Sequence, residues 1–353
     1  MHQNGTALTN DTDLSLGSVK QVDLEQVVIN VLYIFTGALV VGGNLCIVAG
    51  ILWHKECRRR KEFIMLSAQC LSDWLYGFGY LWGGCRRLYL FLTHQAHTPV
   101  TPWHCMHAEV STFFFLVGPQ AAALVNLFVS VDRLMAVAFV SFYAKLGVDY
   151  VLKAVGCLYL LALLSYLSAF VASYRMDPTK RVFLQCLSTW ASTSDYAVFY
   201  TALITGAEIL SVLIYIVVMS VLKHRQRTAH PSLQSAHQQR QARITRTMAL
   251  VVSCTMLFYV APWLTTSTIS ALQIHLGNAR LLSPILWVLV NTNNVCNMLI
   301  YIYRLPEIRM AIASLFCGKK FAKVCIGMTT TAAFDRKLNA TIVKSSKPTT
   351  IAS

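Results

Sequence analysis

Long apolar stretches separated by short polar segments fill most of the sequence. Seven of these stretches reach the roughly 20 residues that a helix needs to cross a bilayer. We therefore predict an all-α membrane protein built as a seven-transmembrane helix bundle. The predicted spans are Val27–Trp53, Phe63–Cys85, Ala108–Val137, Val151–Tyr174, Tyr196–Leu222, Thr247–Leu272 and Leu281–Tyr303.

Composition and charge agree with a chain immersed in lipid. Of the 353 residues, 56% are hydrophobic and only 13% are charged. If the amino terminus lies outside, the cytoplasmic segments hold 23 of the 30 Lys and Arg residues, which follows the preference for basic residues on that side. The net charge of +15 is therefore typical of a plasma-membrane protein and does not indicate nucleic-acid binding.

The polar segments divide the chain into four regions. Residues 1–26 are predicted to form an extracellular tail, 27–303 the seven-transmembrane domain, 304–317 an amphipathic juxtamembrane helix, and 318–353 a disordered cytoplasmic tail. Asn4 and Asn10 open glycosylation sequons in the extracellular tail. Cys317 directly follows the amphipathic segment and is a candidate for palmitoylation.

Two of the eleven cysteines differ from the others, most of which lie inside spans as small packing residues. Cys105 lies at the outer start of the third span, and Cys186 lies in the longest outer loop. Both face the oxidising side, so a disulfide between them is chemically allowed. We favour this pair because no other cysteine is placed in an outer loop, although sequence alone does not prove the pairing.

Short motifs follow one another in order on five of the spans. They are Gly43-Asn44, Leu71-Ser72-Asp73, Asp132-Arg133-Leu134, Pro262 and Asn297-Met298-Leu299-Ile300-Tyr301. Together they resemble the rhodopsin-like G-protein-coupled receptors over residues 27–317. The segments Arg58–Phe63, Ser67–Asp73 and Asp132–Val137 further resemble nematode serpentine chemoreceptors of the Srsx type.

The sequence also departs from the usual pattern of that family. Leu134 stands where Tyr usually follows Asp-Arg, Met298 replaces a Pro, and Val260 stands where a Trp usually precedes Pro262. The fifth span lacks its usual Pro. Because these changes remove two kinks and a rotamer switch, we expect the moving parts of the mechanism to differ.

The resemblance implies how the cytoplasmic end couples to a heterotrimeric G protein. At rest Asp132 neutralises Arg133, and activation brings two phenols toward Arg133 as the sixth helix swings outward. The residues implied in coupling and activation are Asp132, Arg133, Tyr215, Pro262, Asn297 and Tyr301. Arrestin and a receptor kinase are further expected partners, besides the lipid bilayer itself.

No Asp or Glu occurs between Glu208 and Glu307. The second restraint on the arginine that many relatives place on helix six therefore cannot form. Raised basal signalling and compensation by hydrophobic packing both remain open.

A polar network is expected in the inner half of the bundle. Asp73 lies in the middle of its span, where a carboxylate costs several kcal/mol unless it is paired, hydrated or protonated. The predicted members are Asn44, Asp73, Asn126, Asn293 and Asn294. The resemblance implies a sodium ion near Asp73; an Asp–Asn packing network without an ion is the alternative, and no other cofactor is expected.

The ligand is expected between the helices near the outer surface, and it can be a small chemosensory molecule or a peptide. Candidate contacts are Glu109, Phe113, Phe115, Trp263, Gln273, Trp287 and Asn291. Glu109 can pair with a cationic ligand or with Arg86 or Arg87, and we favour an internal pair. Four outer histidines, at positions 94, 97, 104 and 107, have spacings that zinc could use, but Pro99 and Pro102 separate them and we predict no metal site.

Two other classes of membrane protein compete with a receptor. A transporter or channel would also bury acids, but no internal repeat is visible and seven spans do not divide into halves. An intramembrane enzyme would need a paired nucleophile and base at membrane depth, and the spans contain no His. We predict no enzymatic activity.

Overall fold

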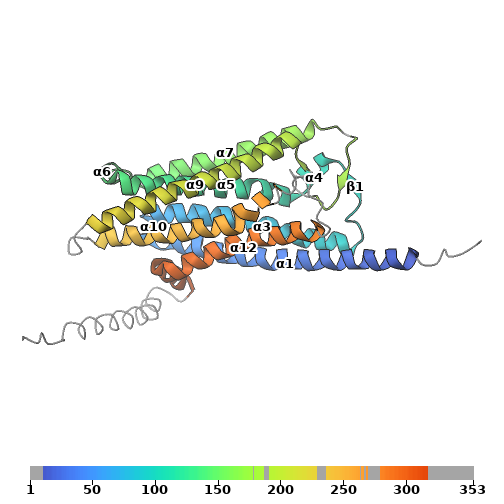
Figure 1. Cartoon of the computed structure of the whole chain (residues 1–353), viewed down its shortest axis with the longest axis horizontal. Helices are drawn as coiled ribbons and strands as arrows, with labels where there is room; N and C mark the ends of the chain where they lie inside the picture. The colour runs from blue at the N-terminus through green and yellow to red at the C-terminus, as the bar shows by residue number, and fades with distance from the viewer. Residues whose placement is uncertain are drawn as a thin grey trace, which may run out of the picture.

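Seven long helical segments lie side by side along the long axis of the molecule (Figure 1). The computed structural model describes residues 11–177, 179–186, 191–228, 236–262, 264–265, 268 and 279–316. Within them the long segments are α1 (Asp11–Trp53), α3 (Lys61–Leu92), α5 (Val110–Ala138), α7 (Val148–Tyr174), α9 (Ser194–Thr228), α10 (Ala236–Thr255) continued by the π-helix η2 (Met256–Val260), and α12 (Ala279–Arg304). Within the described residues the predicted spans fall on these helices, except that Ala108 belongs to α4 and Glu109 is not helical. Residues 263, 266–267 and 269–272 of the sixth predicted span lie outside the described residues.

Five of the long segments are apolar enough over their length to cross a membrane. They are Leu24–Trp53, Val110–Ala138, Val148–Tyr174, Ser194–His224 and Arg243–Val260. The remaining two, α3 and α12, have 32 and 26 residues and pack against α1 and against each other. Polar residues such as Asp73 lower the hydropathy of α3, and their burial among the other helices satisfies the rule that ionisable groups face the bundle interior.

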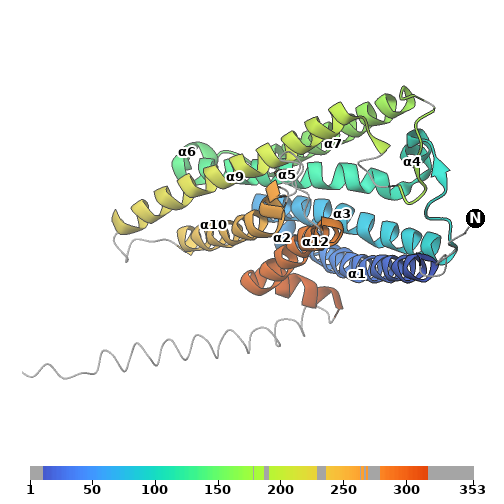
Figure 2. The ribbon, with the colours of Figure 1, turned by 45° about the vertical axis from the view of Figure 1, so that its right-hand side comes forward.

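Short elements occupy the two ends of the bundle (Figure 2). One end carries β1 (Pro99–Val100), α4 (Pro102–Ala108) and β2 (Val182–Phe183), and β1 pairs antiparallel with β2. We call it the disulfide end. The opposite end carries α2 (Lys55–Arg58), α6 (Val140–Tyr143) and the helical residues 306–316, and we call it the Asp132 end.

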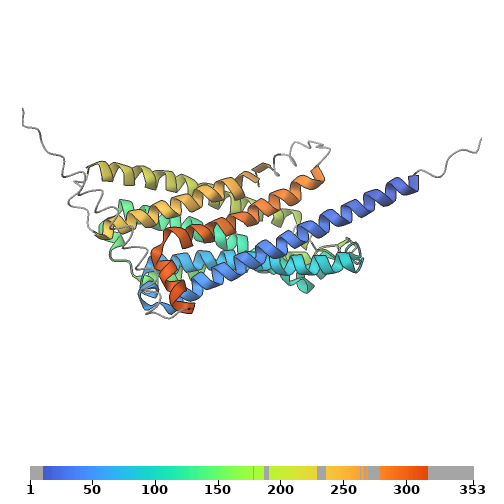
Figure 3. The same ribbon diagram turned by 90° about the horizontal axis from the view of Figure 1, so that it is seen from below.

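The first helix begins at Asp11, well before the predicted start of the first span, so α1 projects beyond its neighbours (Figure 3). Helical hydrogen bonds are local, so a helix can continue out of the apolar layer when its sequence allows.

Glycines let α1 and α3 approach closely. A Cβ added to Gly37 would lie 2.6 Å from the backbone nitrogen of Leu81, and one added to Gly77 would lie 2.5 Å from the Cγ1 atom of Val40. Small residues at such crossings replace the hydrophobic driving force, which is absent between helices in lipid, with close van der Waals contact.

A short helix follows α12, as predicted for the juxtamembrane segment. Residues 306–316 are helical. Leu305, Ile308 and Ala311 are buried in a core that includes Ile47 and Ile51 of α1, whereas Arg309 is exposed. The eighth helix of the predicted fold class is therefore present, and its apolar face packs on the carboxyl-terminal end of α1.

The sixth long segment contains a wide turn that the sequence analysis did not predict. In η2 the backbone N–H of Ala261 donates to the carbonyl of Met256, an i to i+5 bond. Pro262 follows at once and has no N–H to give to the preceding turn. The widened turn therefore accommodates the proline at this point of the helix.

Candidate receptor sites at the two ends of the bundle

At the Asp132 end, a set of hydrogen bonds joins α5 to the short helix α6. Asp132 and Arg133 are both fully buried and form an ion pair of 2.7 Å. The Tyr143 hydroxyl donates to the same Asp132 oxygen at 2.9 Å and accepts from Arg133 at 3.2 Å. The predicted neutralisation of Arg133 by Asp132 is thus seen in the structure, with Tyr143 as an additional member.

Lys61, the first residue of α3, holds Tyr143 from the other side. Its Nζ donates to the carbonyl oxygens of Tyr143 at 2.9 Å and Leu146 at 3.1 Å, and it lies 3.3 Å above the centre of the Tyr143 ring. These contacts combine a helix C-terminal cap with a cation–π interaction. We call Lys61, Asp132, Arg133 and Tyr143 the Asp132 cluster.

Burial sets the protonation behaviour of Lys61 and Tyr143. It lowers the pKa of Lys61, while the nearby Asp132 carboxylate opposes that effect. Burial also raises the pKa of Tyr143 above its usual range, so its hydroxyl keeps the proton that it donates to Asp132. The sequence analysis missed Lys61 and Tyr143 because both act through contacts between distant segments.

Tyr215 and Tyr301 are buried in the large core cluster at this end of the bundle. Neither hydroxyl has a hydrogen-bond partner in the part of the chain that the structure describes. A buried hydroxyl without a partner costs about 1–3 kcal/mol. Both phenols would therefore gain from a rearrangement that supplies a partner.

The predicted polar network separates into two groups. Asp73 accepts a 3.4 Å hydrogen bond from Gln69, and Asn297 lies beside it with both amide atoms unpartnered. Asn126 instead donates to Glu208 of α9 at 3.0 Å, next to a 2.5 Å contact between the hydroxyls of Ser130 and Ser211. The second group therefore ties α5 to α9.

Asn44, Asn293 and Asn294 are buried, and Asn44 donates to the Val40 carbonyl of its own helix. One side-chain atom of each, together with one oxygen of Asp73, has no partner among the described residues. The orphaned oxygens of Asn44, Asn293 and Asp73 fit water or a hard cation, whereas the orphaned atom of Asn294 is its amide nitrogen, which can only donate. Both the sodium network and the ion-free packing network remain compatible with this donor set.

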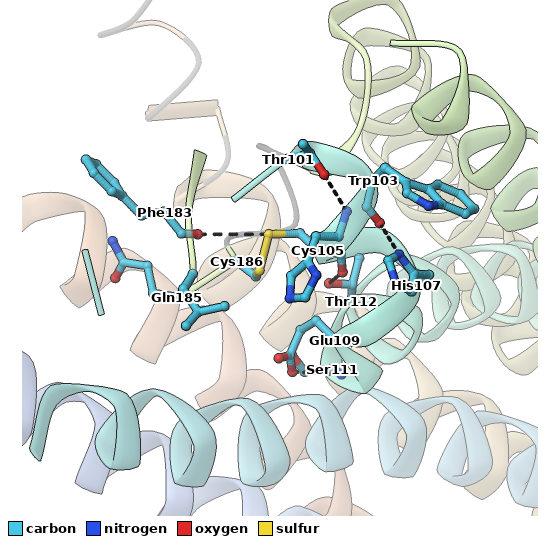
Figure 4. Close-up of a disulfide and its surroundings, with 12 residues drawn as sticks. Thr101, Trp103, Cys105, His107, Glu109, Ser111, Thr112, Phe183, Gln185 and Cys186 are labelled. Carbon is cyan, nitrogen blue, oxygen red and sulfur yellow. Dashed lines mark hydrogen bonds between the residues drawn. A yellow bond between two sulfur atoms is a disulfide. The ribbon is translucent and has the colours of Figure 1, made fainter. Parts of the chain in front are cut away.

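At the disulfide end, Cys105 and Cys186 form the expected disulfide (Figure 4). Cys105 lies in α4, a separate helix capped by Thr101, and not on the third long helix as predicted. Glu109 has an extended backbone and begins α5 by accepting from the Ser111 N–H at 3.2 Å. This break separates the helix that carries Cys105 from the long helix that carries Arg133.

The favoured internal ion pair is present as Arg86–Glu109. Arg86 also donates to the Leu184 carbonyl at 3.1 Å, and Arg87 donates through Nε to the Gln185 carbonyl at 3.2 Å. The end of α3 therefore binds the backbone of the loop that the disulfide and β2 also fix.

The other ligand candidates face different neighbours. Phe115 lies 5.1 Å from the Tyr80 ring of α3, whereas Phe113 lies 5.0 Å from Tyr166 of α7. Asn291 is buried and donates to the Thr36 hydroxyl of α1 at 2.6 Å. Trp263, Gln273 and the Trp287 side chain lie outside the described residues, as do Asn4, Asn10 and Cys317.

The described residues include no group of three or more His, Cys, Asp or Glu side chains that could hold a metal ion. The rings of His104 and His107 lie 5.5 Å apart, and His107 already bonds the Trp103 carbonyl at 2.7 Å.

The bundle, the eighth helix, the disulfide and the buried Asp-Arg pair define a multi-pass receptor of the seven-transmembrane class. The family model described as serpentine type 7TM GPCR chemoreceptor Srsx matches residues 38–316, and the chain belongs to that family. The predicted resemblance is thus confirmed. The family is a receptor family and not an enzyme class. None of the curated proteins compared with the chain matches it.

Proposed function

We propose that this chain transmits the binding of an extracellular small molecule or peptide to a heterotrimeric G protein. The disulfide end faces outside and the Asp132 end faces the cytoplasm, with the amino terminus outside and the carboxyl terminus inside. The distribution of basic residues supports this orientation. The buried Asp132–Arg133–Tyr143 arrangement is the single observation that carries the proposal.

The arrangement describes a resting state with an available alternative. Arg133 is held by Asp132 and Tyr143, while the Tyr215 and Tyr301 hydroxyls are buried without partners among the described residues. An outward movement of α10 lets Arg133 leave Asp132 and lets the phenols exchange an unpaired state for a hydrogen-bonded one. Pro262 and Asn297 are proposed to take part on α10 and α12.

A groove at the proposed cytoplasmic end favours a partner that carries acidic groups. It has a volume of about 290 Å³. It lies between α9 and α10 and is lined by Met219, Ser220, Leu222, Lys223 and Arg246. Its two basic side chains are exposed and attract negative charge. Arrestin and a receptor kinase are further proposed partners, which would act on the tail beyond residue 316.

For the ligand side, we propose contacts to Glu109, Phe113, Phe115 and Asn291, with Trp263, Gln273 and Trp287 as further candidates. Glycosylation at Asn4 and Asn10 and palmitoylation at Cys317 are proposed on the same topology. A sodium ion near Asp73 is proposed as one of two possibilities.

The coupling proposal can be tested without knowing the ligand. Asp132→Asn keeps the size of the side chain and removes the charge that holds Arg133, so we expect basal G-protein activation to rise at least severalfold. Adding Arg133→Ala to that variant should return the signal to that of mock-transfected cells. The measurement is dissociation of each Gα class from Gβγ by energy-transfer sensors, at matched surface expression.

Arg175→Ala serves as the matched control, because Arg175 is an exposed arginine at the opposite end of the bundle. If Asp132→Asn activates no Gα class while its surface expression is normal, the coupling proposal is wrong. Ion currents in patch clamp that do not require a G protein would instead favour a channel.

A further inference from the structure

Two consecutive arginines at the outer end of α3 have different surroundings. Arg86 pairs with Glu109 and keeps part of its side chain exposed. Arg87 is only 9% exposed and points among the helices. Its one hydrogen bond within the described residues runs from Nε to the Gln185 carbonyl.

Glu109 is already committed to other groups. One of its oxygens accepts from the Ser111 N–H and the Ser111 hydroxyl, at 3.2 and 2.6 Å, and the other meets Arg86. The charged groups that act on Arg87 are Glu109 and Arg86. Within the group formed by Arg86, Arg87 and Glu109, two guanidinium charges against one carboxylate leave one positive charge unbalanced.

The two terminal nitrogens of Arg87 have no protein acceptor among the described residues. These nitrogens keep some contact with solvent, but the side chain as a whole is only 9% exposed, so its charge is incompletely solvated. A planar guanidinium presents parallel N–H groups in a fork that matches a carboxylate. A bound monoanion would satisfy both the donors and the charge.

Aromatic rings adjoin this guanidinium. Its central carbon lies 5.6 Å from the centre of the Phe115 ring. Tyr80 packs at 5.1 Å against Phe115 and at 5.2 Å against Tyr33. Tyr33 lies within electrostatic range of Arg87, and its own hydroxyl has no hydrogen bond to the described residues. The wall next to the charge is therefore apolar with polar edges.

We propose that Arg87 is the counter-ion of an amphiphilic monoanionic ligand, a carboxylate carried on an aromatic or aliphatic body. The carboxylate binds the terminal nitrogens of Arg87, and the body packs against Phe115, Tyr80 and Tyr33. The inference rests on the proposed receptor function and specifies its ligand class. A cationic ligand is disfavoured next to Arg87, because the neighbouring Glu109 is already paired with Arg86.

The test uses the full chain purified into phosphatidylcholine nanodiscs, without a G protein. The probes are phenylacetate and octanoate, each compared with its neutral primary amide at the same concentration. Thermal unfolding is followed by thiol-reactive dye fluorescence. We expect saturable stabilisation by both carboxylates and none by the amides, since a ligand that binds only the folded state raises Tm.

Arg87→Gln should weaken carboxylate binding about tenfold or more, and Arg175→Gln should leave it unchanged. Arg87→Lys keeps the charge but loses the fork, so it should retain carboxylate selectivity at lower affinity. If Arg87→Gln does not fold, the carboxylate affinity of Arg87→Lys serves as the test in its place.

Stabilisation by carboxylates that is absent, that is matched by the amides, or that persists in Arg87→Gln would overturn the inference. These outcomes do not depend on signalling. A receptor that binds carboxylates but activates no G protein would refute the proposed coupling and leave the anion site standing. A receptor that activates a G protein but does not bind carboxylates would refute the anion site and leave the proposed coupling standing.

Discussion

The Asp132 cluster and the group formed by Arg86, Arg87 and Glu109 each hold two basic side chains and one acid, but their hydrogen bonds are arranged differently. In the Asp132 cluster, Lys61 caps backbone carbonyls, Arg133 pairs with Asp132, and Tyr143 bonds to both. In the other group Arg86 pairs with Glu109, and the terminal nitrogens of Arg87 find no acceptor among the described residues.

This difference corresponds to two tasks. A set of polar groups that satisfy one another stabilises one arrangement of the helices, and the arrangement changes only when several bonds break together. A largely buried charge with unused donors is selective, because only a molecule with matching acceptors can form the hydrogen bonds that the protein itself does not supply. The Asp132 cluster is therefore suited to stabilise one arrangement of the helices, and Arg87 is suited to recognise a ligand.

The largest expected effect comes from untying the disulfide end. Cys105→Ser removes the link between α4 and the loop that bonds Arg86 and Arg87, at a cost of about 2–5 kcal/mol. Surface expression and thermal stability should fall strongly. Cys85→Ser is the control, since Cys85 is an exposed free cysteine on α3. Equal expression of both variants would show that the outer arrangement does not need the disulfide.

A substitution where α1 crosses α3 should affect both ends at once. Gly37→Ala places a Cβ 2.6 Å from the Leu81 backbone nitrogen, so the helices must separate at a cost of about 1–3 kcal/mol. Gly42→Ala meets nothing within 4 Å and should stabilise α1 by about 0.5–1 kcal/mol. Thermal unfolding of the purified variants measures the contrast, and a Tm for Gly37→Ala at or above the native value would contradict it.

A smaller change weakens the hydrogen bonds of the Asp132 cluster alone. Tyr143→Phe deletes the hydroxyl bonds to Asp132 and Arg133 but leaves the ring beneath Lys61. Losing about 1 kcal/mol of restraint should raise basal G-protein activation up to about fivefold. Tyr150→Phe is the control, because the structure gives the Tyr150 hydroxyl no hydrogen bond among the described residues. Carboxylate binding should be unchanged.

The smallest effect is a pH dependence confined to the disulfide end. Burial and the neighbouring His107 lower the pKa of His104 below its ordinary value of 6.5. The unfolded chain therefore takes up the proton first as the pH falls, and the stability that neutral His104 contributes above that value is lost below it. We expect the Tm at pH 5 to be lower than the Tm at pH 7 by less than about 2 °C. This difference should disappear in His104→Gln and persist in His97→Gln.

Much of the architecture followed from sequence because it depends on local composition. Apolar length predicted the helices, and the amphipathic character of residues 304–317 predicted the short helix that follows α12. The disulfide followed from compartment and loop position. The break at Glu109 was not predicted, because α4 and α5 are separated by one residue in an extended conformation inside an otherwise helical sequence.

Side-chain partners across helices were harder to predict. Lys61 and Tyr143 are 82 residues apart in sequence, and no local pattern relates them. Asn126 was grouped with Asp73 from its residue type, whereas the structure places its amide against Glu208, also 82 residues away. Which helix faces which is set by packing, so such pairs become visible only when the bundle is assembled.

The wide turn in the sixth segment has a consequence for how that helix can move. One residue more than the regular count is accommodated between Met256 and Ala261, which corresponds to about 100° of rotation. If the extra residue migrates along the helix, the stretch it passes turns about its own axis while most backbone bonds remain intact. Swivelling of this kind would present different side chains to α9 and α12 without any bending of the segment.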